Sequence, residues 1–100
     1  MRLTKQQVES IKNIAKQVFG DKASVLLFGS RVDDSKKGGD IDLCIETDIE
    51  DIETIVKARN KFTALLKQKI GDQKIDVVLS YPAGPHLAIH KIAHETGVYL

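Results

Sequence analysis

The sequence predicts an α/β or α+β fold, in which a small mixed sheet of three strands, or slightly more, carries helices packed mainly on one face. Two observations favour this class. Segments with apolar residues at helical spacing alternate with three short apolar runs typical of buried strands. No internal repeat, low-complexity tract or linker interrupts this alternation. We therefore expect a single domain over residues 1–100.

The first helix and the first strand have clear sequence signals. Gln7 follows Thr4 at the spacing of a capping box, apolar residues recur behind it at helical spacing, and Gly20 marks the end. Residues 24–28 form a compact apolar run that reads as a buried strand and ends at Gly29. A helix followed by a strand is therefore expected over the first 28 residues.

The rest of the chain predicts two more strands and three helical segments. Residues 31–39 are polar, which indicates a short helical turn and then a loop. Residues 40–46 alternate strictly, so one strand face is aliphatic and the other is mostly acidic. Residues 75–79 form the third strand, and the last helix follows the turn at 81–85 and ends at Gly97. A long helix is expected from about residue 49 to residue 70, with an inner stripe of Ile52, Ile55, Val56, Arg59, Phe62, Leu65, Leu66 and Ile70.

Composition excludes several functional classes. Lys plus Arg number 15 and Asp plus Glu number 14, and this near balance argues against a domain whose main task is to coat nucleic acid. The single cysteine, Cys44, cannot form an internal disulfide. No signal peptide and no membrane-spanning run is present in the sequence. We expect a soluble cytoplasmic protein.

Three carboxylates stand where folding alone does not require them. Asp40 and Asp42 share one face of a strand, and Asp76 interrupts an apolar run. Unpaired buried carboxylates are costly, and two close together repel unless a positive charge lies between them. One or two divalent cations would supply that charge, and oxygen-only ligands favour Mg²⁺ or Mn²⁺. Taken singly, each residue also fits an ordinary solvent-facing position.

Gly29 and Ser30 follow the first predicted strand and open the predicted helical turn. A glycine lets a phosphate approach the backbone, and amide groups at a helix start point at an anion. The Ser30 hydroxyl adds a donor, and Arg31 would neutralise further phosphate charge together with Lys36 or Lys37. Taken alone, the Gly-Ser pair also fits an ordinary turn with an N-cap serine.

Together these residues resemble the signature of the polymerase-β-type nucleotidyltransferase superfamily. The signature is Gly29-Ser30, a nine-residue spacer and Asp40-Ile41-Asp42, and Asp76 matches the third carboxylate, on the next strand. The closing segment, residues 92–100, is similar to the end of the minimal, single-domain branch, which includes antitoxins paired with HEPN toxins. The resemblance covers essentially the whole chain and implies a nucleotidyltransferase fold.

The resemblance also implies a two-metal mechanism. Asp40 and Asp42 would hold two Mg²⁺ ions, Asp76 would hold one of them and act on the incoming hydroxyl, and Gly29-Ser30 would bind the triphosphate. Arg31 lies at a position that the family fills variably, so its role stays open.

The activity that the resemblance implies is transfer of a nucleotidyl group, AMP from ATP or the equivalent from another nucleoside triphosphate, to a hydroxyl. The implied acceptor is a HEPN-type toxin, which would make the chain the antitoxin of a toxin–antitoxin pair. An RNA end as acceptor and a homo-oligomer stay open. Two other classes stay open as well: a module that neutralises its partner by docking alone, and a regulatory domain that binds nucleotide without turnover.

Three histidines, His86, His90 and His94, stand four residues apart on the last predicted helix. That spacing spreads them over about 12 Å, too far for all three to share one ion, so we reject a zinc site. We expect a polar stripe that faces solvent or a partner.

The remaining polar residues have ordinary interpretations. Cys44 is expected to be a small, partly buried filler, and Glu46 a solvated strand end rather than a fourth metal-binding acid. Arg59 is expected to extend its charged end toward solvent or to pair with an acid. Lys67 and Lys74 are interpreted as basic surface.

Overall fold

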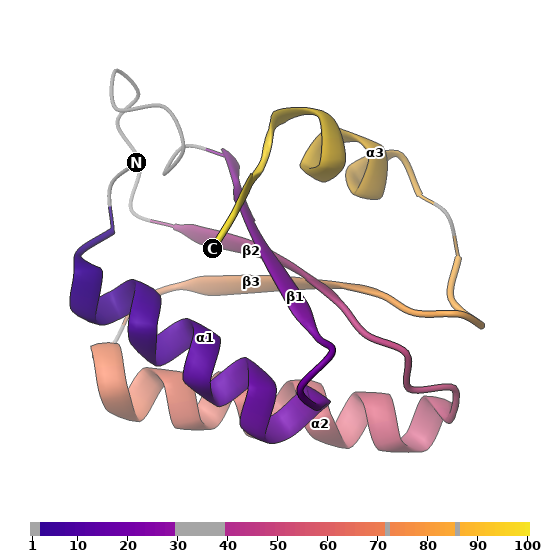
Figure 1. The fold of residues 1–100 in the computed structure, drawn as a ribbon, viewed down its shortest axis with the longest axis horizontal. Coiled ribbons are helices and arrows are strands. Elements are labelled where there is room, and N and C mark those ends of the chain that lie inside the picture. The colour runs from indigo at the N-terminus through magenta and orange to yellow at the C-terminus, as the bar shows by residue number, and fades with distance from the viewer. Residues whose placement is uncertain (1–2, 30–39, 72, 86) are drawn as a thin grey trace.

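The computed structural model describes residues 3–29, 40–71, 73–85 and 87–100, and the predicted turn and loop at residues 31–39 lie outside these ranges. The elements of the described part are α1 (Lys5–Phe19), β1 (Ser24–Phe28), β2 (Ile41–Glu46), α2 (Ile52–Ile70), β3 (Ile75–Ser80), α3 (Ala88–Thr96) and β4 (Val98–Tyr99). Figure 1 shows α1 and α2 side by side along one face of the sheet and α3 across from them.

Local signals set the helix boundaries. The Thr4 hydroxyl accepts the Gln7 amide at 3.0 Å and the Gln7 side chain accepts the Thr4 amide at 2.9 Å, which confirms the predicted capping box. The long helix begins at Ile52 rather than near residue 49. The Asp51 carboxylate accepts the Thr54 amide at 3.0 Å, and this N-cap fixes the later start.

The four strands form one mixed sheet in the order β3-β2-β1-β4, in which β2 and β3 are parallel and the other pairs are antiparallel. The predicted α+β class and the three predicted strands are confirmed. The short strand β4 is an addition, because two residues carry no alternation that a sequence pattern can detect. It pairs with Leu26 and Leu27 of β1 and so brings the end of the chain to the sheet.

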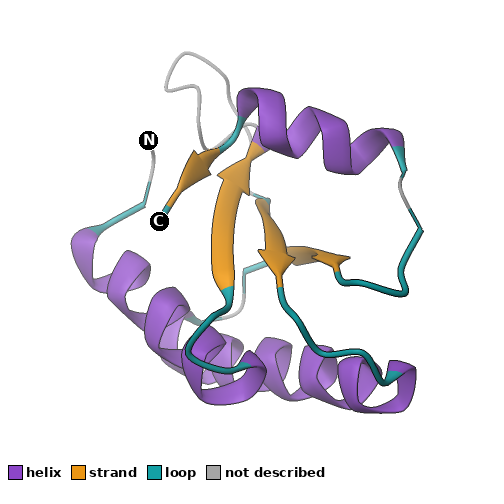
Figure 2. Ribbon diagram, turned by 45° about the vertical axis from the view of Figure 1, so that its right-hand side comes forward, coloured by secondary structure: helices purple, strands orange, loops and turns teal. Residues whose placement is uncertain are grey.

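The alternation along β2 separates two apolar layers. Ile41, Leu43 and Ile45 are fully buried against α1 and α2. On the opposite face, Cys44 packs with Phe28 and with Ala93 of α3. Figure 2 shows α3 on the side of the sheet opposite α1 and α2, and Ala93 is its buried contact with that face. The polar residues of β2 therefore lie on the sheet face that carries this helix.

Cys44 is more deeply buried than expected, with no exposed surface. Burial, with a smaller contribution from the negative charge of Glu46, raises the pKa of its thiol to about 11. The thiol is therefore neutral at physiological pH and fills space between sheet and helix.

The predicted inner stripe of α2 was too wide. Ile55, Phe62 and Leu66 are buried as expected, and Ala58 joins them. Ile52 and Val56 are instead 58% and 51% exposed, because the narrower buried stripe leaves one flank of the helix uncovered beside β3. Val56, on that flank, lines a groove between α2 and β3.

No helix in the described ranges is long and apolar enough to span a membrane.

Candidate functional site

The sheet brings two of the three predicted carboxylates together. Asp42, near the start of β2, is the direct register partner of Asp76, near the start of β3. Both side chains lie on the face that carries α3, because they share parity with Cys44 and Val78 on these strands. Phe28, the last residue of β1, pairs with Asp42 from the other side. The ends of three strands thus meet at this pair.

The neighbouring acidic side chains perturb the Asp42 carboxyl group. Partial burial, followed by the negative charges of Asp76 and then Asp40, raises the pKa of Asp42 above its ordinary value. A hydrogen bond between the Asp42 and Asp76 side chains acts in the same direction, and Lys74 opposes it. Two carboxyl groups can hydrogen-bond only when one of them carries a proton. The pair therefore needs a proton or a cation to be stable at close range.

Asp40 lies at the same end of the sheet but has a different partner. Its carboxylate is 3.7 Å from the Lys74 ammonium; the Lys74 side chain is mostly exposed and the Asp40 side chain about half exposed. The β2–β3 register places these two residues opposite each other, just ahead of their strands. Within the described residues, no group of three or more acidic, histidine or cysteine side chains is gathered closely enough to form a ready metal site.

Gly29 is required by both conformation and space. Its φ of +78° lies in the left-handed region that favours glycine. A Cβ at this position would overlap a carboxylate oxygen of Asp42 and lie 3.1 Å from its Cγ. The sequence predicts that this glycine admits a phosphate, and the structure adds that it also leaves room for the Asp42 carboxylate. Ser30 and Arg31, the other predicted nucleotide-binding residues, lie outside the described residues, as do Lys36 and Lys37.

Lys74 is exposed, as a basic surface residue is expected to be, but it also has a place at the site. It lies opposite Asp40, and its charge partly offsets the rise in the pKa of Asp42. The sequence held a signal for this position. Lys74 stands two residues before Asp76, and Asp40 stands two residues before Asp42, so parallel strands that pair Asp42 with Asp76 also set Lys74 opposite Asp40.

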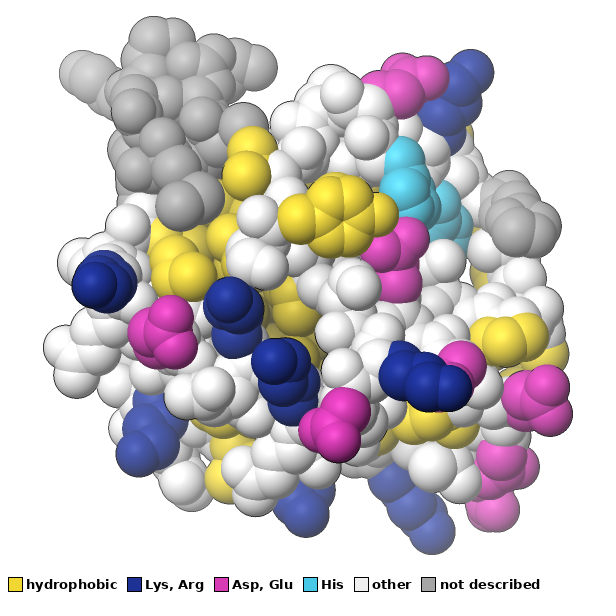
Figure 3. Space-filling view, in the orientation of Figure 1, with side chains coloured by type: hydrophobic (Ala, Val, Ile, Leu, Met, Phe, Trp, Pro, Cys, Tyr) yellow, Lys and Arg dark blue, Asp and Glu magenta, His cyan; other side chains and the backbone are white. Residues whose placement is uncertain are grey.

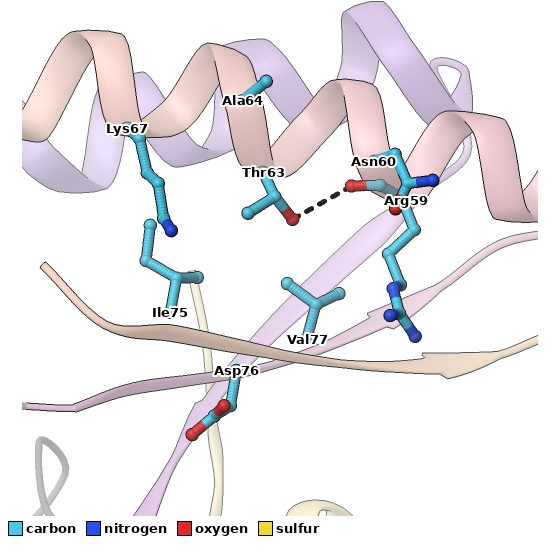
Figure 4. A pocket seen from close by; sticks show the side chains of 8 residues that line it. All are labelled: Arg59, Asn60, Thr63, Ala64, Lys67, Ile75, Asp76 and Val77. Atoms are coloured by element: carbon cyan, nitrogen blue, oxygen red, sulfur yellow. Dashed lines mark hydrogen bonds between the residues drawn. The ribbon is translucent and has the colours of Figure 1, made fainter. Parts of the chain in front are cut away.

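A groove between α2 and β3 was also missed. It has a volume of about 530 Å³ and is lined by Arg59, Asn60, Thr63, Ala64, Lys67, Ile75, Asp76 and Val77. Figure 4 shows Arg59 and Lys67 reaching from α2 toward β3, while the Asp76 carboxylate points to the opposite side of the strand. Arg59 was expected to pair with an acid or reach solvent. It is exposed, and it forms no ion pair with any described residue.

Contrary to the sequence prediction, His90 does not belong to a polar stripe that faces solvent or a partner. His90 is only 8% exposed, and its ring joins the Leu87 amide at 3.0 Å to the Leu79 carbonyl at 2.8 Å. His94 hydrogen-bonds Glu46 at 2.6 Å. His86 lies outside the described residues. The polar groups of a short helix near the sheet need partners, and these rings provide them.

Glu46 lies at the opposite end of β2 from Asp42 and is not simply solvated. It accepts the Tyr99 hydroxyl at 2.8 Å as well as the His94 ring. The residue therefore joins β2, α3 and β4. Figure 3 shows histidine, acidic and hydrophobic side chains in contact on this face, and elsewhere acidic and basic side chains are intermixed.

Comparison with known proteins places this geometry in a family. No curated protein matches the chain. A family model described as a nucleotidyltransferase domain matches residues 8–99, which include all three aspartates and Gly29-Ser30. A match over nearly the whole chain, together with the mixed sheet and its flanking helices, supports transfer of nucleotidyl groups as the general activity. The chain belongs to the nucleotidyltransferase domain family.

Proposed function

We propose that this chain transfers a nucleotidyl group, AMP from ATP in the first instance, to a hydroxyl on a partner protein. The observation that carries the proposal is the Asp42–Asp76 pair, held in register on neighbouring strands and seated against Gly29. Burial and the negative charges of Asp76 and Asp40 raise the pKa of Asp42, so the fold disfavours this group in its charged form, and such groups gather at functional sites.

The chemistry of the donor set fits divalent cations. Asp40, Asp42 and Asp76 offer only carboxylate oxygens, and Lys74 is the basic group that opposes their charge among the described residues. Such a set suits two Mg²⁺ ions, or Mn²⁺, with Asp40 and Asp42 holding both and Asp76 holding one. When bound, the ions would neutralise the charge that develops on the phosphates during transfer.

The proposed reaction is an in-line displacement at the α-phosphorus. The acceptor oxygen forms a bond to the α-phosphorus, the bond between the α-phosphorus and the bridging oxygen breaks, and pyrophosphate leaves with that electron pair. The acceptor proton passes to the Asp76 carboxylate, which is exposed and faces the same side as Asp42. We assign triphosphate binding to Gly29 and Ser30, with a contribution from Arg31, on the basis of the sequence motif.

The acceptor we propose is a tyrosine of a HEPN-type toxin, so that the modification would silence the toxin. The support is the resemblance of residues 92–100 to antitoxins of this branch, which is an analogy of family rather than of geometry. An RNA end is the less favoured acceptor because the chain carries a net charge of only +1.

Label transfer tests this proposal directly. Purified chain, α-³²P-ATP and Mg²⁺ are incubated with a HEPN-type toxin encoded beside it, using wild type, the Asp40→Asn/Asp42→Asn double variant and Asp21→Asn, an exposed control. We expect label on the toxin with wild type and with Asp21→Asn, and none with the double variant. A stable complex that carries no label in any reaction would contradict the enzyme and favour neutralisation by docking.

A further inference from the structure

The free edge of β3 forms the floor of one continuous groove. Among the described residues, the sheet order leaves β3 without a strand on its outer side. The polar part of the groove, described above, continues into a second part of about 500 Å³ that includes Val56, Tyr81 and Leu87. Arg59 and Val77 line both parts, so the two are continuous.

Backbone groups at this edge are available for pairing. The carbonyls of Lys74 and Ser80 accept backbone amides of β2 and the loop after it, so the even-numbered residues of β3 face β2. Ile75, Val77 and Leu79 therefore direct their backbone groups outward. The Leu79 carbonyl already accepts the His90 ring. Ile75 and Val77 thus offer two amides and two carbonyls to an incoming strand, within the part of the chain that is described.

The side chains around this edge specify what would bind. Ile75 and Val77 point toward α2, and Asp76 points to the other side (Figure 4). On an added strand, alternate residues would likewise face the two sides. One set would meet Arg59 and Lys67, which form no ion pair with described residues. The residue of the added strand that stands between two residues of this set would face the other side and lie beside Asp76.

We propose that an extended segment of the protein acceptor adds to the free edge of β3 as a further strand. Its hydroxyl residue lies next to Asp76, and acidic residues on either side of that residue face Arg59 and Lys67. This inference rests on the proposed function, because it places the acceptor oxygen beside the carboxylate that takes its proton. It adds the recognition pattern of the acceptor: acid, hydroxyl residue, acid, in an extended conformation.

A second copy of this chain fits the groove less well. Paired antiparallel through its own β3, it would turn Ile75, Val77 and Leu79 toward α2 of the first copy. All three are apolar, so Arg59 and Lys67 would gain no acidic partner, and the Asp76 of the second copy would face the other way. Charge complementarity therefore selects an acidic acceptor segment over self-association.

Titration of the ¹⁵N-labelled chain by NMR tests docking without any nucleotide present. The probe is a capped peptide, Val-Glu-Tyr-Glu-Val-Thr, compared with the same peptide carrying Lys in place of both Glu residues. We expect the Ile75 and Val77 amides to shift and to exchange with solvent more slowly with the acidic peptide. Arg59→Glu/Lys67→Glu should weaken its binding about tenfold. Lys57→Glu/Lys61→Glu, a matched reversal outside the groove on the same helix, should leave binding unchanged.

Three results would overturn the docking proposal: no amide shifts at millimolar peptide, equal binding of the two peptides, or a wild-type dimer in sedimentation whose interface is β3. Failure of the proposed function has a different signature. If the acidic peptide binds at β3 but takes no label from α-³²P-ATP with Mg²⁺, the docking surface stands and transfer to this acceptor is wrong.

Discussion

At the scale of single residues, Gly29 and Asp42 constrain each other. The positive φ of Gly29 ends β1, and the missing Cβ leaves room for the carboxylate of Asp42 on the neighbouring strand. A change at either residue therefore acts on the other. The chain offers a control for the conformational part of this effect: Gly20 has a φ of +103°, but a Cβ there would meet nothing within 4 Å.

Replacing Gly29 by Ala should damage both fold and activity. The left-handed backbone costs an alanine roughly 1–3 kcal/mol, and the added methyl displaces the Asp42 carboxylate. Displacement of a reacting group by about 1 Å can lower transfer roughly 100-fold. Gly20→Ala should lose similar stability but retain label transfer. Thermal melts and α-³²P-ATP assays of the two variants check this, and equal transfer by both would contradict the role given to Gly29.

Replacing Asp42 by Asn should stabilise the fold while abolishing transfer. A raised folded-state pKa means that the fold disfavours the charged form. Stability is therefore highest below the unfolded pKa of about 3.8 and falls as pH rises through the folded pKa, so the full penalty acts at neutral pH. We expect Tm at neutral pH to rise on the order of 2 °C without metal, and the gain to shrink in acid. Asp48→Asn, an exposed control, should change neither Tm nor transfer.

At the scale of secondary structure, patterns within one element were predictable and partners between elements were not. The alternation over residues 40–46 gave the two faces of β2, and Thr4 with Gln7 gave the start of α1. The start of α2 was wrong because Asp51 competes with upstream residues as the N-cap. The spacing of the histidines predicted that they share one face of the last helix, but it did not predict which residues that face contacts. His90 is buried because the Leu79 carbonyl lies within its reach.

The contact between α3, β2 and β4 should depend on pH. The hydrogen bond to Glu46, and then the one to the His90 carbonyl, raise the pKa of His94. A histidine whose folded pKa is raised contributes stability fully below its unfolded pKa, about 6.5, and loses that contribution as pH rises through the folded value. Because the His94 side chain is 42% exposed, we expect less than about 1 kcal/mol.

Urea unfolding of wild type and His94→Gln measures this contribution. The stability difference between the two proteins should be larger at about pH 6 than at about pH 9. A difference that does not vary with pH would show that the histidine acts through packing alone. Tyr99→Phe, which removes the other hydrogen bond to Glu46, should leave the pH dependence in place.

At the scale of the whole molecule, the site depends on the register of β2 with β3. The sequence motif named the three aspartates without showing which of them adjoin. Register makes Asp42 and Asp76 direct neighbours and sets Lys74 opposite Asp40. The strand order places β3 at an edge that no other described strand covers. Each of these relations depends on how β2 pairs with β3, whose paired residues are more than thirty positions apart in the sequence. Local periodicity within one strand does not specify that pairing. Lys74 and the groove were missed for this reason.

Because the site joins the ends of β1, β2 and β3, its occupation should stabilise the whole chain. We expect Mg²⁺ with α,β-methylene-ATP, which cannot be cleaved at the α–β bond, to raise Tm. A ligand at 100 times its Kd adds about 2.7 kcal/mol, or about 10 °C for a domain of this size. Either component alone should give much less, since the carboxylates repel a triphosphate that brings no cation. Asp42→Asn should lose most of the shift, although its fold is intact. A full shift in EDTA would mean that the nucleotide binds without the carboxylates, and the metal-binding role proposed for Asp40, Asp42 and Asp76 would be wrong.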